Sequence, residues 1–103
     1  MKMYILVRDD IPLGFALVAA AHASLACYLQ FQDLSSTKQW LNRSFRKVVC
    51  KVSPEEFEKA KEIKQLEKVV LTESSLEGAE TAIAFAPMEK WPHFFHTLKL
   101  YKD

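Results

Sequence analysis

Two polar segments carry side chains that could do chemistry. The first, residues 8–14, opens with an arginine and two aspartates, and the second, residues 72–75, contains Glu73. Each follows a short apolar run that is typical of a buried strand. When such strands are parallel, ligands tend to bind beyond their carboxyl ends. We therefore predict that the two segments form a site at one end of a sheet.

The histidines and cysteines do not have metal-binding spacing. His93 and His96 stand three residues apart, but no cysteine or closely spaced carboxylate completes a set of ligands. Cys27 and Cys50 lie in apolar stretches, as buried thiols of a reducing compartment do. His22 lies in an apolar helix, where a hydrogen-bonded core position and a functional role are both open. We expect no metal, no other cofactor and a cytoplasmic location.

Two groups of residues could contact nucleic acid. Arg8 could join a basic stretch if both lie on one face, although a mixed, solvated surface is the alternative. That stretch contains Lys38, Arg43, Arg46, Lys47 and Lys51. An aromatic group could stack on bases but is also typical of core packing, and it consists of Trp91, Phe94 and Phe95. The net charge of +1 adds no overall basic excess.

The composition is that of one soluble globular domain, which we place at residues 1–103. The chain is 50% hydrophobic and 26% charged, and its 103 residues suffice for one core but not for two. The stretch Ile11–Gln32 is uncharged and nearly long enough to span a membrane. Because it is rich in alanine and contains Pro12 and Gly14, we expect a helix packed on more than one side, not a membrane segment or a signal peptide. The apolar surplus also makes a homodimer plausible.

Periodicity and turn residues predict four strands and four helices. The expected strands are 3–7, 47–52, 69–72 and 81–86, the last ended by Pro87. The expected helices are 15–31, one starting at Ser36, one starting after Ser53, and 89–97, with an extended tail at 98–101. Ser36 with Gln39, and Ser53 with Pro54 and Glu56, resemble helix-capping sequences. This order predicts a single-domain α/β fold: a four-stranded mixed, mostly parallel sheet covered by helices on both faces.

Several of these stretches together resemble the type 2 peptidyl-tRNA hydrolases, small enzymes that cleave the ester joining a peptide to tRNA. The opening 4–10 is similar to the family's first strand and its Arg-x-Asp turn. Gly14 stands eight residues before His22, and Tyr28 follows six residues later, as in the family. The segments 47–49, 81–87 and 98–101 resemble the second strand, the strand with a family threonine, and the closing motif.

The resemblance implies a catalytic lysine directly after Gly14, where this sequence has Phe15. The family glutamine four residues further on is Ala19 here, and the family aspartate after the third strand has Glu73 as its nearest counterpart. If activity is retained, the resemblance implies catalytic roles for Glu73, Thr81 and His22, with His22 or Arg8 replacing the lost cation.

The resemblance also implies tRNA as the partner, without a membrane. The substrate-binding residues it implies are Arg8, Gly14, Phe15, Arg46 and Lys47. Two functions remain open: a hydrolase of peptidyl-tRNA, or a non-catalytic relative that binds RNA, a small ligand or a protein. Packing that sealed the face around Phe15 would exclude the ester from it and favour the second.

Overall fold

The first apolar run forms a central strand of the sheet. In the computed structural model, which describes residues 1–102, β1 (Lys2–Arg8) has five buried residues in succession, so both of its faces are covered. It pairs in parallel with β2 (Arg46–Val52) and antiparallel with β4 (Ala79–Met88). The last residue of the predicted domain, Asp103, lies outside the described residues.

The sheet has five strands in the order β3-β4-β1-β2-β5, where β3 is Lys68–Glu73 and β5 is Lys99–Leu100. The predicted mixed sheet with helices on both faces is confirmed, but a fifth strand is present because the extended tail pairs with β2. Although β1, β2 and β3 run in the same direction, β4 lies between β1 and β3. Within residues 1–102, β1 and β2 therefore form the only parallel ladder.

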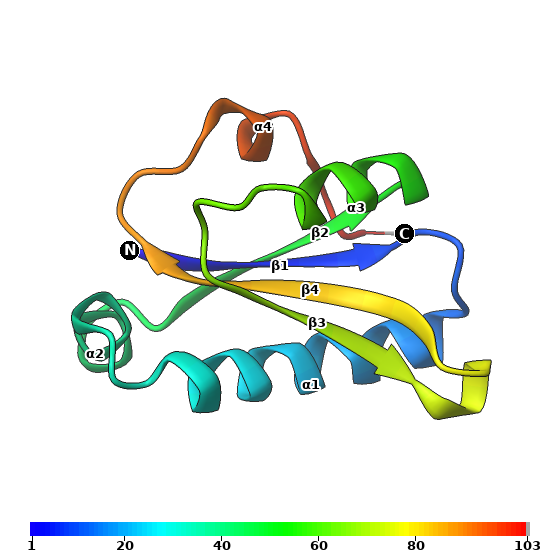
Figure 1. Ribbon diagram of the computed structural model, residues 1–103, viewed down its shortest axis with the longest axis horizontal. Coiled ribbons are helices and arrows are strands. Elements are labelled where there is room, and N and C mark those ends of the chain that lie inside the picture. The colour runs from blue at the N-terminus through cyan, green and yellow to red at the C-terminus, as the bar shows by residue number, and fades with distance from the viewer. Residues whose placement is uncertain (103) are drawn as a thin grey trace.

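Helices cover the two faces of the sheet (Figure 1). α1 (Leu13–Phe31) lies on one face, and α2 (Ser35–Asn42) follows it at the end where β1 begins. α3 (Pro54–Lys61) and α4 (His93–His96) lie on the other face. Side chains alternate along β1 and β4, so each face of the sheet has its own core. Alanines dominate the core under α1, and aromatic rings dominate the core under α3 and α4.

α1 packs on one side only. Its buried residues are Ala16, Ala19, Ala23, Cys27 and Phe31, and they face the sheet. The opposite side carries exposed leucines, so the prediction of packing on more than one side is wrong. By length and composition alone, α1 could also cross a membrane.

The aromatic group near the C-terminus belongs to the core. Trp91 and Phe95 are buried, with ring centroids 4.8 Å apart, and Tyr4 lies 4.8 Å from Trp91. Phe85 meets Phe95 edge to face at 5.0 Å. Because Trp91 and Phe95 are covered by protein, the core interpretation is confirmed over base stacking for these two rings.

The start of α3 follows the predicted capping box. Ser53 Oγ accepts the Glu56 N–H at 3.1 Å, and Glu56 Oε1 accepts the Ser53 N–H at 2.8 Å. The same prediction for Ser36 is wrong, because α2 begins at Ser35 and has no side-chain cap.

Pro87 does not end β4. The strand continues to Met88, and its pairing with β1 is irregular between Lys2 and Tyr4. Such an irregularity accommodates a proline, which has no N–H to donate to the ladder.

Candidate active site at the carboxyl end of the sheet

The two predicted polar segments lie at the same end of the sheet. β1, β2 and β3 end there, and the antiparallel β4 begins there, which we call the carboxyl end. Arg8, Glu73 and Thr81 therefore lie at this end, together with the first turn of α1. Arg8 and Glu73 flank β4 on either side, so their strands are about 10 Å apart.

Arg8 is held by the second aspartate of its own turn. Its Nε and Nη2 donate to the two carboxylate oxygens of Asp10 at 2.9 and 2.6 Å. These hydrogen bonds raise the pKa of Arg8 and lower the pKa of Asp10, so the pair stays ionised at neutral pH. The guanidinium lies 5.7 Å from the ring centroid of Phe57 in α3. Arg8 is thus a half-buried cation with a fixed orientation.

A second cation reaches the same end from α3. Lys61 Nζ lies 2.7 Å from Glu80 in β4 and 3.5 Å from Glu58 in its own helix. The hydrogen bond to Glu80 raises the pKa of Lys61. Glu58 and Glu80 also raise the pKa of Arg8 by electrostatic attraction, after the larger effect of Asp10. We call these residues the charged cluster: Arg8, Asp10, Glu58, Lys61 and Glu80.

Thr81 is the extra residue of a β-bulge. Leu71 pairs with Ala82 while Thr72 pairs with Glu80, so Thr81 has no partner on β3. Thr81 is only 2% exposed, and its hydroxyl donates to the Leu71 carbonyl at 3.4 Å. The bulge sets the orientation of the start of β4, from which Glu80 reaches Lys61.

Glu73 is fixed by its own loop. One carboxylate oxygen, Oε2, accepts the Ser75 N–H at 3.0 Å and caps a short 3₁₀ helix, η1 (Ser74–Leu76). The side chain is half-buried. Both alternatives for this segment, a solvated loop and the border of a site, are compatible with this geometry.

The site residues predicted on α1 differ in exposure and in their distance from the carboxyl end of the sheet. Gly14 is exposed, and a side chain added there would meet nothing within 4 Å, so space does not require a glycine. Phe15 is half-buried at the carboxyl end. His22 is exposed, so its core interpretation is wrong. It lies seven residues beyond Phe15, about 10 Å along the helix, and the structure does not bring it into the charged cluster.

Arg46 and Lys47 lie at the opposite end of the sheet. They begin β2, and Arg46 is paired with Lys2 while Arg8 is paired with Val52. Six residues of strand, about 20 Å, separate the two ends. Lys47 Nζ lies 3.1 Å from the Phe45 ring centroid, and burial lowers the pKa of Lys47. The structure therefore does not bring Arg46 and Lys47 to the end of the sheet where Arg8 lies.

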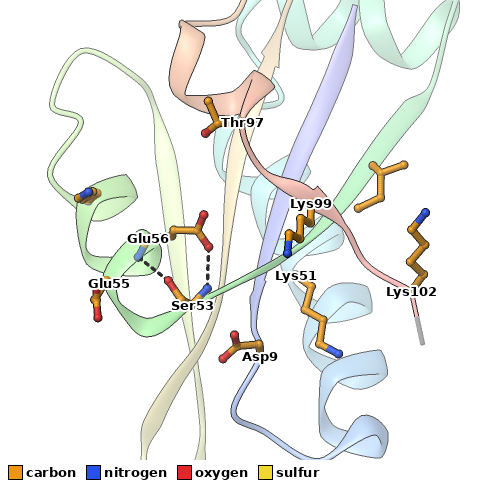
Figure 2. Close-up of a pocket in the computed structure, with 10 residues that line it drawn as sticks. Asp9, Lys51, Ser53, Glu55, Glu56, Thr97, Lys99 and Lys102 are labelled. Carbon is orange, nitrogen blue, oxygen red and sulfur yellow. Dashed lines mark hydrogen bonds between the residues drawn. The ribbon is translucent and has the colours of Figure 1, made fainter.

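A large cavity lies around the ends of β1 and β2, next to the turn that follows Arg8 (Figure 2). It has a volume of about 810 Å³ and is open to solvent. Lys51, Lys99 and Lys102 line the side formed by β2 and the C-terminal tail, and Ser53 and Glu56 line the side formed by α3. Asp9, the residue next to Arg8, lies at its border.

Sequence reasoning missed most of this cavity and cluster. Lys61 and Glu80 stand 19 residues apart, and Lys99 and Lys102 come from the tail. A close pair of opposite charges at that separation gives no local sequence pattern. Within residues 1–102, no group of three or more histidine, cysteine, aspartate or glutamate side chains is placed to hold a metal ion.

The sequence of this chain matches one known protein family over nearly its whole length. A sequence model described as "Peptidyl-tRNA hydrolase PTH2" matches residues 1–101. The chain belongs to the peptidyl-tRNA hydrolase PTH2 family. A search of curated proteins found no match. The family match spans all five strands, both polar segments and every residue that lines the cavity except Lys102.

Proposed function

We propose that this PTH2 family member hydrolyses the ester between peptide and tRNA at the carboxyl end of its sheet. The observation that carries the proposal is Arg8, a half-buried cation fixed by Asp10 beside the lysine-lined cavity. An ester hydrolase needs such a fixed donor where negative charge develops. Phe15 cannot supply it from α1, and Arg8 lies at the same end of the sheet.

The lysines of the cavity suit the phosphates of a tRNA end. Four lysines line the cavity beside three carboxylates, Asp9, Glu55 and Glu56, and Lys51, Lys99 and Lys102 come together on the side formed by β2, β5 and the tail. Lysines that neutralise phosphates release counterions, so tRNA binding should weaken as salt is raised. In this proposal the cavity holds the acceptor end, and the ester lies near the border of the cavity at Asp9, the neighbour of Arg8 in the sequence.

The reaction follows from the side chains at this end. Glu73, oriented by the Ser75 N–H, takes a proton from a water that attacks the ester carbonyl. Arg8 stabilises the resulting oxyanion through N–H groups that Asp10 does not use. The bond to the ribose oxygen then breaks, and that oxygen takes the proton from Glu73. The products are a free peptide acid and a tRNA with a free terminal hydroxyl.

Thr81 and Lys61 act as positioning residues. Thr81 is too buried to touch a substrate, and its bulge orients the start of β4. Lys61 pairs with Glu80 and so limits how much Glu80 attracts Arg8. The free, buried thiols of Cys27 and Cys50 fit a reducing compartment, which supports the cytoplasm as the location.

Substituting Glu73 tests this assignment. Glu73→Gln keeps the shape of the side chain but removes its basicity, so we expect peptide release from peptidyl-tRNA to fall roughly 100-fold or more. Glu77→Gln in the same loop is the matched control, because Glu77 is exposed and should leave the rate unchanged. Equal rates in the native chain and Glu73→Gln would remove Glu73 from the mechanism.

Phe15 supports the second candidate function, a non-catalytic module that binds tRNA. The first turn of α1 has no cation, and Phe15 there is half-buried. Such a module would bind tRNA with the same salt dependence but release no peptide. The same assay therefore separates the two functions.

A further inference from the structure

The lysine-lined cavity also has acidic side chains in its lining. Three carboxylates line it together with the lysines: Asp9, Glu55 and Glu56. Carboxylates repel the phosphates of a tRNA end, so a purely anionic ligand does not account for them. Each of the three therefore has either a structural role or a cationic group of the ligand as its partner.

Two of the three carboxylates have structural roles in α3. Glu56 accepts the Ser53 N–H at 2.8 Å and completes the capping box. Glu55 lies in the first turn of the same helix, where a negative charge interacts favourably with the helix dipole. The stability of α3 thus explains both glutamates without a ligand.

Asp9 has no such structural role. Its backbone N–H donates to the Val52 carbonyl at 2.8 Å, a contact available to any residue except proline. Its side chain is exposed, and within residues 1–102 its carboxylate accepts no hydrogen bond and forms no ion pair. The carboxylate that holds Arg8 is that of the next residue, Asp10. Asp9 therefore presents a negative charge to the cavity that the fold does not use.

Asp9 and Arg8 approach α3 from neighbouring positions at the end of β1. The Arg8 guanidinium lies 5.7 Å from the Phe57 ring centroid, and Asp9 lines the cavity together with Ser53 at the start of α3. Figure 2 shows the Asp9 carboxylate extending away from the Lys51 amine. The Cα atoms of consecutive residues are about 3.8 Å apart. A cationic donor and a carboxylate thus come from adjacent positions at this border of the cavity.

An aminoacyl ester carries two groups that match this pair. Its α-nitrogen lies about 2.5 Å from the ester carbonyl carbon, because a single Cα joins the two atoms. When the amino group is free, this nitrogen is a cation beside the oxygen on which negative charge develops. In peptidyl-tRNA the same nitrogen belongs to an amide, which donates a hydrogen bond but has no charge. A substrate whose carbonyl oxygen contacts Arg8 therefore brings its α-nitrogen toward Asp9.

We propose that Asp9 binds the free α-ammonium group of an aminoacyl-tRNA, so that this chain hydrolyses aminoacyl esters as well as peptidyl-tRNA. This inference rests on the proposed function, because the reaction uses Glu73 and Arg8 in the same roles. Water adds to the carbonyl carbon, the bond to the ribose oxygen breaks, and that oxygen takes the proton that Glu73 removed from the water. The products are a free amino acid and a tRNA with a free terminal hydroxyl. The phosphates then lie among the lysines and the ammonium group at Asp9, so the ligand matches both kinds of charge in the lining.

Two substrates that differ in this one charge test the proposal. They are an aminoacyl-tRNA and the same molecule with its amino group acetylated, compared at about pH 6.5, where the free amino group is charged. We expect the native chain to hydrolyse both, and Asp9→Asn to lower the ratio of the free-amino rate to the acetylated rate about tenfold, the effect of one charge-assisted hydrogen bond. Asp33→Asn is the matched control. It makes the same chemical change in an exposed residue just beyond the end of α1, outside the cavity lining, and should keep the native ratio.

The outcomes separate this inference from the proposed function. Hydrolysis of the acetylated substrate alone, or a native ratio in Asp9→Asn, would overturn the role of Asp9 and leave the proposed function intact. If neither ester is hydrolysed, the proposed function fails, and the affinities for stable amide-linked analogues of the two tRNAs decide the role of Asp9. The native chain should then bind the free-amino analogue about tenfold more tightly than the acetylated one, and Asp9→Asn should not. Equal affinities of the native chain for the two analogues would refute the inference.

Discussion

Arg8→Gln should lower the rate of peptide release from peptidyl-tRNA by roughly 100-fold, the cost of losing one strong donor to an oxyanion. Glutamine keeps a hydrogen-bonding side chain but loses the positive charge and the paired contacts with both oxygens of Asp10. α1 carries no lysine or arginine, so that helix offers no cation to compensate. Single-turnover kinetics with saturating protein would separate this loss from weaker tRNA binding.

Arg46→Gln is the matched control for that substitution. It makes the same chemical change at the opposite end of the sheet, about 20 Å away along the strands. We expect its single-turnover rate to equal that of the native chain. If Arg46→Gln were the more damaging change, the site would lie at the amino end, and the assignment of Arg8 would be wrong.

Phe85→Ala should destabilise the fold by about 3–5 kcal/mol, a large part of the roughly 5–15 kcal/mol typical of a domain. Phe85 is fully buried on β4, an interior strand of the sheet. It meets Trp91 and Phe95 edge to face, with centroids 6.2 and 5.0 Å away. Deleting the ring leaves a cavity and removes both contacts, and denaturant unfolding would measure the loss.

Phe45→Ala is the control for the stability measurement. Phe45 is more than half exposed, and alanine at its left-handed position is no less strained than phenylalanine. We expect it to cost about 1 kcal/mol or less. Similar losses for the two substitutions would mean that the aromatic core under α3 and α4 does not dominate stability.

Local signals predicted the local structure well. The cap of α3 needs only Ser53, Pro54 and Glu56, and all of its hydrogen bonds join residues three apart. Ser36 failed as a cap because Ser35 already begins α2, a shift of one residue that the sequence pattern does not resolve. Pro87 failed as a strand end because an irregular pairing with β1 absorbs it.

Long-range arrangement was harder to predict. The sequence gives no indication that β4 inserts between β1 and β3, so the number of parallel ladders was overestimated. The same insertion places Glu80 beside Lys61, a contact that depends on α3 as well. The positions of Arg46 and Lys47 could have been deduced from the sequence. In a parallel pair, residues that begin one strand and residues that end its neighbour lie at different ends of the sheet.

The most direct test of the central proposal is the number of peptides that each molecule of the native chain releases from excess peptidyl-tRNA. Our account predicts many released peptides per protein molecule, at a rate that falls as salt weakens contacts with phosphate. Release no faster than spontaneous hydrolysis, by protein that still binds the tRNA, would contradict it and leave a tRNA-binding module without catalysis.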